Sequence, residues 1–294
     1  KPLQIAVCGR PNAGKSTLLN HMVGAKVSIV THKVQTTRAL IRGIAMQGET
    51  QIIFVDTPGI FDPRRRLDRA MIKTAWSGTQ DADVVCLLVD AKRGITESVV
   101  EILERLKTVR QPRLLVLNKI DLVPRDELLE LTEKANAICE FDETFMVSAL
   151  NGDGVADLMK YLCAKMPIGP WLYPEDQASD LPMRQLAAEI TREKLFLRLH
   201  EELPYASTVE TEDWKTLRDG SARVEQTIYV QRASQKKIVI GKGGQTIRGI
   251  SSDARREMAE IYGQKVHLFL FVKVRENWID DPERYREMGI DFTQ

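Results

Sequence analysis

The stretch Gly9–Thr17, "GRPNAGKST", decides the fold of the first half of this chain. It fits the pattern G-x-x-x-x-G-K-[ST], follows the apolar run "QIAVCG" and precedes the apolar "TLLNHMV". Glycines let successive backbone N–H groups point into one concavity at a helix N-terminus, where phosphate oxygens bind. We expect Lys15 to reach the outer phosphates and the Ser16 hydroxyl to ligate Mg²⁺. The predicted phosphate-binding residues are Gly9, Asn12, Ala13, Gly14, Lys15, Ser16 and Thr17.

Strand-like runs continue from this loop to about Met166. They are "QIAVCG", "TQIIFVDTPG", "DVVCLLVDA", "RLLVLNKID" and "ETFMVSAL". Continuous apolar runs are typical of parallel strands buried on both faces. Between them, "TESVVEILERLKTV" places Ile102, Leu103 and Leu106 on one helical stripe. The pattern predicts an α/β domain with a doubly wound, mostly parallel sheet, whose ligands bind at the carboxyl ends of the strands.

The stretch "NKID" at one of these strand ends indicates which base is bound. An ionised aspartate only accepts hydrogen bonds, so Asp121 suits the ring N–H and exocyclic amine of guanine and would reject adenine. We expect Asn118 to tie the strand end to the phosphate loop and the Lys119 stem to cover the base. Ser148 and Ala149, at the last strand end, are expected to support the base through backbone N–H groups.

Two further segments are expected to respond to the terminal phosphate. "DTPG" ends the "IIFV" strand, so Asp56 would hold Mg²⁺ through water and the Gly59 N–H would sense the phosphate. "QTTR" lies between the first helix and the next strand, and Thr37 is favoured over Thr36 as a further metal ligand. The predicted switch residues are Thr36, Thr37 and Arg38 in the first segment and Asp56, Thr57, Pro58 and Gly59 in the second.

The motifs in this order resemble those of small GTPases of the translation-factor-related class. Ile60 stands where Ras-like enzymes carry the glutamine that orients the attacking water. Isoleucine cannot hydrogen bond, so another group must fill that role, and no side chain is named as a general base. The resemblance implies that Asn12 helps bind a potassium ion in place of an arginine finger. A purely structural role for Asn12 is equally open.

A domain boundary is predicted at "MPIGPWLYPED", whose three prolines and glycine cannot continue a helix or a central strand. Residues 1–168 would form the first domain, 169–180 a linker, and 181–294 a second domain with a C-terminal tail. In the latter, "MRQLAAEITREKLFLRLHEEL" predicts a helix with Leu186, Ile190 and Leu197 on one face. Strands are expected near "STVETED", "RVEQTIYVQR" and "KVHLFLFVKVR".

A second glycine loop, "VIGKGGQTI", fits neither nucleotide template. A dinucleotide fingerprint needs glycine at Thr246, and a phosphate loop needs a hydroxyl residue at Gly243. The pattern I-G-x-x-G-x-x-I between two helices resembles the KH-domain loop, which clamps about four nucleotides. The element order matches an α+β type II KH domain, whose third strand lies at the carboxyl end.

Basic residues surround this loop, although the net charge of the chain is only +1, from 42 Lys and Arg against 41 Asp and Glu. Charges alone also fit a solvated helix face; the glycine loop at their centre favours RNA. Ile238, Ile240 and Ile247 would form an apolar floor for bases. The predicted RNA-binding residues are Lys236, Lys237, Ile240, Gly241, Lys242, Gly243, Gly244, Ile247 and Arg248, with Arg255, Arg256 and Lys273 nearby.

The whole chain resembles the Era GTPases, through "GRPNAGKSTLLN", "QTTR", "VDTPG", "NKID", "PED", "REKL", "ELPY", "QKKIVIGKGG" and "VKVRENW". The resemblance implies a Mg²⁺-dependent, potassium-stimulated GTPase that binds the 3′ end of small-subunit ribosomal RNA. It also implies a role in small-subunit maturation, with GTP controlling RNA affinity, and loose peripheral association with the membrane. We expect a monomer with no DNA partner.

Cysteine content and hydropathy indicate the cellular compartment, and two other functions are considered. Four cysteines without close pairs favour a reducing environment, and no apolar stretch reaches the roughly 20 residues that span a bilayer. We expect a cytoplasmic protein; an organelle matrix after leader removal is the alternative. The rivals are an RNA-binding protein with a structural nucleotide, which would lack turnover, and a phosphate-loop kinase. "NKID" and the absence of an acceptor domain argue against the kinase.

Overall fold

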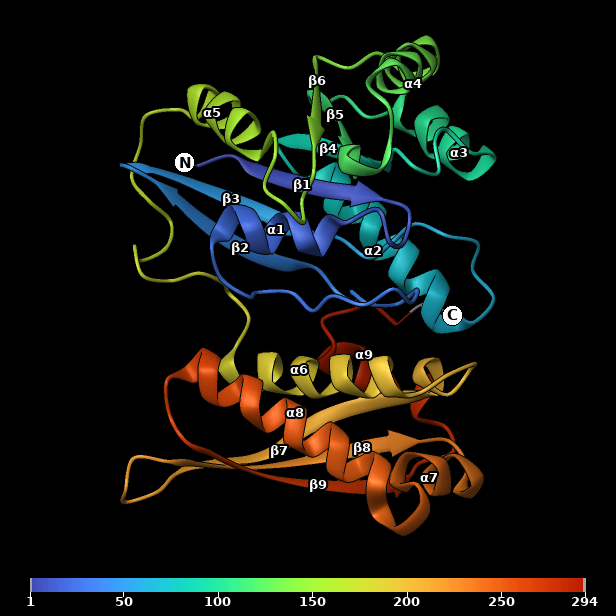
Figure 1. The fold of residues 1–294 in the computed structure, drawn as a ribbon, viewed down its shortest axis with the longest axis vertical. Helices are drawn as coiled ribbons and strands as arrows, with labels where there is room; N and C mark the ends of the chain where they lie inside the picture. The colour runs from blue at the N-terminus through green and yellow to red at the C-terminus, as the bar shows by residue number, and fades with distance from the viewer. Residues whose placement is uncertain (1, 293–294) are drawn as a thin grey trace. The chain divides into compact units, whose positions relative to one another are not determined.

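The computed structural model describes residues 2–292, and the chain divides into two compact units (Figure 1). The first contains the chain up to Asp180 together with the residues from Met288 on, and the second is Leu181–Glu287. Within the described residues, no helix is both long enough and apolar enough to cross a membrane.

Unit 1 is built on a six-stranded sheet in the order β2-β3-β1-β4-β5-β6. All neighbouring strands run parallel except β2 and β3, which are antiparallel. Because the chain returns through a helix before most strands, their carboxyl ends meet at one edge of the sheet. The strands are β1 (Gln4–Gly9), β2 (Ile41–Gln47), β3 (Thr50–Asp56), β4 (Val84–Asp90), β5 (Arg113–Asn118) and β6 (Glu143–Val147).

Helices cover both faces of this sheet. One apolar cluster joins α1 (Lys15–Val23) and α5 (Val155–Lys165) to the sheet. The other joins α2 (Arg66–Asp81), α3 (Glu97–Leu106) and α4 (Arg125–Ile138) to the opposite face. As predicted, Ile102, Leu103 and Leu106 are all buried. The predicted doubly wound α/β fold is confirmed.

Two features of unit 1 differ from the sequence prediction. Strand β2 is not among the predicted runs: its burial is interrupted at Arg42, as suits an edge strand.

The stretch 169–180, predicted as a linker, is hydrogen bonded to the β2–β3 hairpin. The Trp171 indole N–H donates to the Glu49 carbonyl at 2.9 Å, and the Gln51 amide bonds the backbone of Leu172 and Tyr173. The Ile44 N–H donates to the Ala178 carbonyl.

Unit 2 contains a three-stranded sheet in the order β7-β8-β9. Strands β7 (Ser207–Thr216) and β8 (Ala222–Val230) are antiparallel, and β9 (Val266–Val274) runs parallel to β8. The helices α6 (Met183–Arg198), α7 (Ala233–Ile240) and α8 (Gln245–Tyr262) pack on one face of the sheet through two apolar clusters. The predicted KH arrangement, with its third strand at the carboxyl end, is confirmed.

The predicted apolar face of α6 is partly wrong. Ile190 is buried, but Leu197 is 50% exposed, and Leu195 and Phe196 fill the core instead. Farther along, Trp278 is fully buried and its indole N–H donates to the Ala206 carbonyl at 3.0 Å. This bond fixes the segment that leads from β9 to α9 (Pro282–Glu287).

Candidate nucleotide site and glycine loop

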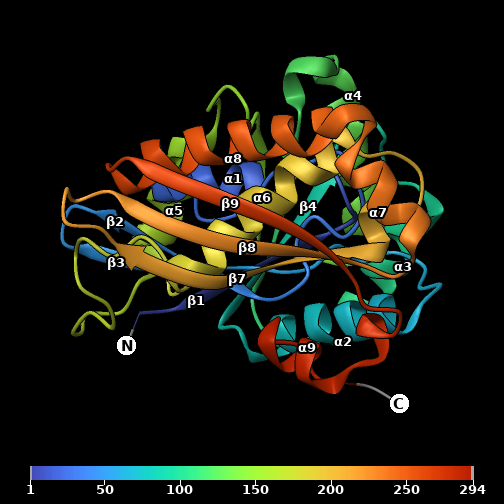
Figure 2. The same cartoon turned by 90° about the horizontal axis from the view of Figure 1, so that it is seen from below.

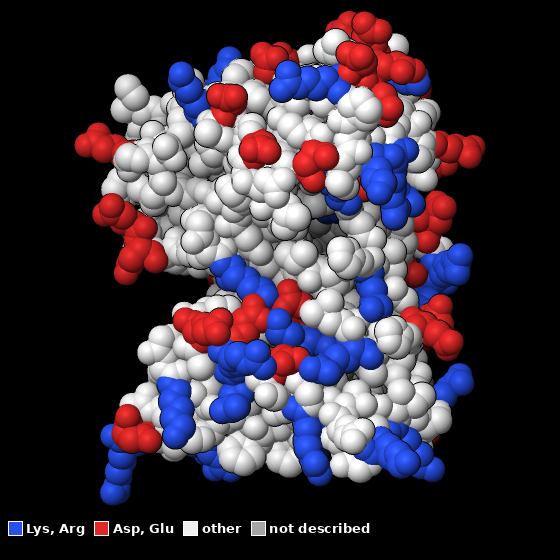
Figure 3. Space-filling model, viewed as in Figure 1, with Lys and Arg blue, Asp and Glu red and all other residues white. Residues whose placement is uncertain are grey.

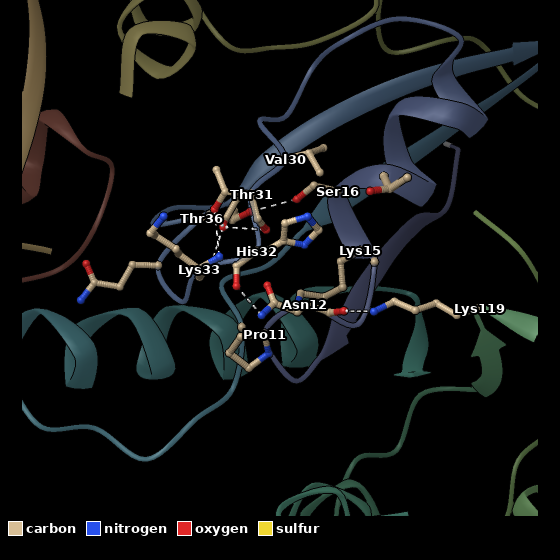
Figure 4. Close-up of a pocket in the computed structure, with 15 residues that line it drawn as sticks. Pro11, Asn12, Lys15, Ser16, Val30, Thr31, His32, Lys33, Thr36 and Lys119 are labelled. Atoms are coloured by element: carbon tan, nitrogen blue, oxygen red, sulfur yellow. Dashed lines mark hydrogen bonds between the residues drawn. The ribbon is translucent and has the colours of Figure 1, made fainter. Parts of the chain in front are cut away.

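The phosphate loop connects β1 to α1 and lines a pocket with residues of the segment 30–37 (Figure 4). Gly14 has φ 98°, and a Cβ there would lie 2.0 Å from Asn118 Nδ2, so the loop requires glycine at this position. Lys15 is buried, and its Nζ donates to the carbonyl oxygens of Gly9 and Arg10 at 3.3 and 2.8 Å. The ammonium therefore lies within the loop, where the predicted phosphate would be.

Three hydroxyl groups converge on Asp56 at the carboxyl end of β3. Its Oδ2 accepts hydrogen bonds from Ser16 at 2.7 Å, Ser28 at 2.8 Å and Thr37 at 3.2 Å. The Ser16 and Thr37 hydroxyls lie 3.1 Å apart. Asp56 is fully buried, yet its Oδ1 has no hydrogen-bond partner among the described residues. A buried carboxylate oxygen without a partner beside two hydroxyls is a donor set that suits a hard cation such as Mg²⁺.

Burial shifts both charged groups of this cluster toward their neutral forms. It lowers the pKa of Lys15, while the nearby Asp56 carboxylate opposes this effect. Burial raises the pKa of Asp56, opposed by Lys15 and by the hydrogen bonds from Ser16, Ser28 and Thr37. The Cys8 thiol, next to the loop, has a pKa raised to about 12 by burial and is inert. Binding of an anion near Lys15 and of a cation near Asp56 would therefore stabilise the charged forms of these two residues.

The end of β5 is joined to the phosphate loop by side chains. Asn118 Nδ2 donates to the Ala13 carbonyl at 2.8 Å, and its Oδ1 accepts from the Ala149 N–H at 2.9 Å. Lys119 Nζ donates to the Asn12 carbonyl at 2.8 Å and to Asp90 Oδ2 at 2.6 Å. Asp121 follows in an exposed turn and lines a second hollow, with Met146 and Asp153 among others. The predicted guanine-binding side chains thus lie at one sheet edge.

The backbone groups predicted to support a base are already hydrogen bonded within the protein. The Ser148 N–H donates to the Asp153 carbonyl at 2.9 Å, and the Ala149 N–H is the group bonded to Asn118. A base contact at either N–H therefore requires one of these bonds to give way. That contact stays a prediction.

Asn12 and the two threonines of the first switch segment differ in what they contact. Asn12 has φ 63°; its Nδ2 donates to the His32 carbonyl at 2.6 Å, while its buried Oδ1 has no partner among the described residues (Figure 4). The Thr36 hydroxyl points away from Asp56 and donates to the Lys33 carbonyl at 2.7 Å. Thr37, by contrast, faces Asp56, as the sequence favours.

The second switch segment is anchored in the core at both of its ends. Thr57 Oγ1 donates to the Val7 carbonyl at 2.9 Å, and the Ile60 N–H donates to the Gly9 carbonyl at 3.0 Å. Gly59 lines the pocket, and a Cβ there would lie 2.9 Å from Pro11 Cγ. The Ile60 side chain is buried among apolar residues. Pro58 lies between these anchors.

Sequence reasoning misses Ser28 and a buried contact between Gln35, which precedes the first switch segment, and helix α2. Gln35 Nε2 donates to Asp68 Oδ1 at 2.6 Å, and Gln35 Oε1 accepts from Arg38 Nη2 at 3.1 Å. Asp68 Oδ2 also accepts from the backbone N–H groups of Arg64 and Arg65, at 3.0 Å each, which caps α2. Gln35 belongs to the "QTTR" stretch, but nothing local indicates its partner, because Asp68 lies 33 positions away in the sequence.

The second glycine loop lies between α7 and α8. Gly241, Gly243 and Gly244 have φ values of 75°, 59° and 76°. The Gly241 N–H donates to the Lys237 carbonyl, which ends α7, and α8 begins directly after Gly244. Ile240 and Ile247 pack against the core of unit 2, whereas Ile238 is 56% exposed. The loop thus presents backbone at the amino end of an 18-residue helix, where anions are favoured.

Four of the basic residues predicted around this loop are available for a partner. Figure 3 shows Lys and Arg side chains gathered over α7 and α8 in the lower part of the view. Lys237, Lys242 and Arg248 are exposed, and Lys236 is partly buried. Within residues 2–292, none of these four makes an ion pair. Arg256, in contrast, is bonded to Asp253. An unpaired cationic surface beside exposed backbone is what a phosphodiester chain would contact.

The fold and its two loops define one class of protein: a phosphate-loop GTPase joined to a KH domain. Family models agree: residues 4–119 match "50S ribosome-binding GTPase", and residues 202–279 match "KH domain". The chain is 66% identical over 290 residues to the GTPase Era of Rhizobium meliloti (strain 1021), covering 99% of this chain and 93% of that protein. Against the GTPase Era of Brucella suis biovar 1 (strain 1330), identity is 65%, with coverages of 98% and 93%.

Two solved structures are also similar over nearly the whole chain. One is Era in complex with MgGDPNP and nucleotides 1506–1542 of 16S ribosomal RNA, with TM-score 0.93, 37% identity and 98% of both chains covered. The other is a variant of Aquifex aeolicus Era bound to GDP and AlF4⁻, with TM-score 0.92, 38% identity and coverages of 98% and 99%. The chain belongs to the Era family of GTPases.

Proposed function

We propose that this GTPase is a Mg²⁺-dependent switch that binds the 3′ end of small-subunit ribosomal RNA and assists assembly of the small subunit. The observation that carries the proposal is the full-length similarity, at TM-score 0.93, to an Era solved with MgGDPNP and a 16S ribosomal RNA segment. Both loops that such ligands need are formed here.

Magnesium fits the cluster around Asp56. The Ser16 and Thr37 hydroxyls would hold the ion, together with the unpartnered Asp56 Oδ1 acting through water. When bound, Mg²⁺ neutralises charge on the transferred phosphate. Ionised Asp56 would then be favoured, which removes the cost of its burial. Chelation by EDTA is therefore expected to abolish hydrolysis, and GDP binding should weaken with it.

Guanine would be read by Asp121, whose carboxylate accepts from the ring N–H and the exocyclic amine. Asn118 holds this strand end against the phosphate loop, so the base site and the phosphate site keep a fixed separation. Lys119, which is bonded to Asn12 and Asp90, would lie along the base plane. Ser148 or Ala149 would support the base after exchange of an existing N–H bond.

A potassium ion beside the nucleotide is supported by Asn12. Its Oδ1 is buried, neutral and without a partner among the described residues, which suits a monovalent cation. Ile60 is buried in the core and holds no position from which to orient water. Replacing K⁺ by Na⁺ is expected to lower turnover about tenfold or more. An unchanged rate in Na⁺ would leave Asn12 with its structural bond to the His32 carbonyl alone.

The glycine loop would hold the RNA. Glycines at 241, 243 and 244 bring backbone close to the phosphodiesters, and Lys236, Lys237, Lys242 and Arg248 supply charge. Gly243 has φ 59°, a left-handed conformation that Asp adopts more readily than most residues, and a Cβ there would meet nothing within 4 Å, so Gly243→Asp is expected to fold and to repel RNA. Such a variant tests RNA binding separately from stability.

Several properties implied by the family resemblance stay predictions. They are a role in small-subunit maturation, a monomeric state, a cytoplasmic location and loose peripheral association with the membrane. The organelle matrix is the alternative location.

The proposal is tested by steady-state GTP hydrolysis in K⁺ and Mg²⁺, with an RNA that copies the 3′ end of small-subunit ribosomal RNA and a scrambled control. Stimulation by the first RNA alone, lost in Gly243→Asp, supports the proposal. Equal rates with both RNAs, at a stated salt concentration, would separate the GTPase from the RNA site.

A further inference from the structure

We infer that the open face of the unit 2 sheet is a second RNA-binding surface, a stacking platform made by Arg223, Phe269, Phe271 and Lys273. The inference rests on the proposed RNA-binding function and extends it to a face that the glycine loop does not reach. Figure 2 shows this sheet from the side opposite α6 and α8, with β9 at its edge.

The rings project from alternate positions of β9. Val266, Leu268 and Val272 point toward the helices and pack in the core, so Phe269 and Phe271 must point to the other face. They are 44% and 49% exposed. Single exposed apolar residues are ordinary, but two rings side by side on one strand form a continuous surface.

Their spacing suits unstacked bases. Alternate residues of a strand lie roughly 6.6 Å apart, about twice the 3.4 Å rise between stacked bases. Bases of a single strand can therefore be splayed out, one on each ring. Aromatic side chains on an open sheet face serve this purpose in the RRM, another RNA-binding fold.

Cations at both ends of the ring pair favour nucleic acid over an apolar protein segment. The Arg223 guanidinium lies 5.1 Å from the centre of the Phe269 ring, and exposed Lys273 follows Phe271 on the same face. Arg223 also contacts Glu225, but this ion pair is exposed and therefore weak, so Arg223 can turn to a phosphate.

The neighbouring part of the same face is already occupied, which limits the platform to about two bases. The ring of Tyr229 has two guanidinium groups, of Arg275 and Arg284, each 5.2 Å from its centre. Arg284 also bonds Glu210 and Glu287, so it is held in place by acidic partners.

The platform is continuous with the glycine-loop site around one strand. Strand β9 lies at the edge of the sheet, and α7 packs against its helix side, where the core joins Val239 to Val272. An RNA that leaves the loop can pass around this edge without meeting another strand. The loop clamps about four nucleotides, so RNAs longer than that are expected to use the platform.

The test compares the full-length chain with Phe269→Ala/Phe271→Ala by fluorescence anisotropy, using labelled RNAs of 4 and 10 nucleotides copied from the 3′ end of small-subunit ribosomal RNA. Wild type and variant are compared at each length. A longer RNA offers more positions at which the protein can bind, and this effect is the same for both proteins. Both residues are exposed, so folding should persist. The matched control is Leu197→Ala, an exposed apolar residue of the same unit.

We expect the double variant to bind the 10-mer about tenfold or more weakly than wild type does. Its affinity for the 4-mer, and the affinity of the control variant for both RNAs, should not change. Phe271→Tyr should keep the affinity and Phe271→Leu should lose it, since stacking and not apolar area is involved. Equal 10-mer affinity in wild type and the double variant would overturn the platform. Failure of wild type to bind even the 4-mer would instead overturn the proposed RNA function.

Discussion

Asp56 illustrates which residues the sequence can identify and which it cannot. The residues of "DTPG" and "GKS" belong to motifs whose local spacing fixes their role, so Asp56 and Ser16 are predicted together. Ser28 donates to the same carboxylate oxygen, but nothing in its neighbourhood signals this. Thr37 can be favoured over Thr36 only by analogy, and the fold supports that choice by turning Thr36 toward Lys33.

Replacing one carboxylate oxygen of Asp121 by an amide nitrogen, in Asp121→Asn, is expected to change the base preference from guanine to xanthine. In Asp121→Asn, the amide can still accept from a purine ring N–H but now donates where the carboxylate accepted. Xanthine has an oxygen in place of the exocyclic amine of guanine, so it becomes the better partner. Replacing the acceptor of the exocyclic amine by a donor is expected to weaken GTP binding by about 10²-fold or more. Competition of GTP and XTP for labelled GDP checks this, and an unchanged GTP preference would remove Asp121 from the base site.

Gln35→Ala tests the buried contact between Gln35 and helix α2. It removes the bonds to Asp68 and Arg38, so we expect about 1–3 kcal/mol less stability in urea unfolding. Because Gln35 is two residues from Thr37, affinity for a GTP analogue should fall about tenfold while GDP affinity stays nearly constant. Gln111→Ala is the control: this glutamine of the same unit is partly exposed, bonds the Gln80 carbonyl and does not line the nucleotide pocket. Equal losses for both nucleotides would make the contact structural only.

Elements are predicted well where the hydrophobic period is strong. The five predicted parallel strands and the α3 stripe agree with the structure; four of these strands are almost wholly buried, and β6, at one edge of the sheet, is only partly buried. Strand β2 is missed because Arg42 interrupts its apolar run, and Leu197 is misplaced because α6 buries charged residues too. Arg192 and Glu193, of 2% and 3% exposure, share its core-facing surface, so polarity alone misleads there.

The two loop glycines of unit 2 should respond differently to substitution. Gly241 has φ 75° and ψ 172°, and a Cβ would lie 2.2 Å from Thr246 Oγ1, so Gly241→Ala combines strain with a clash. We expect a loss of about 2 kcal/mol or more. Gly243, with φ 59° and ψ 20° and open space around it, should tolerate Gly243→Asn. Hydrogen exchange of α7 and α8 measures both, and equal protection in the two variants would contradict the geometry.

Across the full chain, composition alone predicts less than local patterns do. The net charge of +1 hides the cations around the glycine loop, and the prolines of "MPIGPWLYPED" lie within unit 1, whose division from unit 2 falls later, between Asp180 and Leu181. The stretch 169–180 and the residues from Met288 on belong to unit 1, as the contact between Arg66 and the Phe292 ring shows. Such contacts join distant positions and leave no local pattern to predict from.

The GTPase and the RNA site are expected to be coupled energetically. If the GTP state binds RNA more tightly than the GDP state by some factor, RNA must strengthen GTP-analogue binding relative to GDP by the same factor. Couplings of this kind are typically about 1–3 kcal/mol, so we expect about a 5- to 150-fold ratio on each side. Two sets of titrations at one salt concentration measure the two ratios. The first measures RNA affinity of the protein with GTP analogue and with GDP. The second measures the affinity for each nucleotide with and without RNA. Gln35→Ala should reduce both ratios together, because its expected loss of about tenfold falls on the affinity for the GTP analogue and not on the affinity for GDP. Identical RNA affinity with GTP analogue and GDP would mean that the two modules act independently. A separate partner would then have to link RNA binding to GTP hydrolysis.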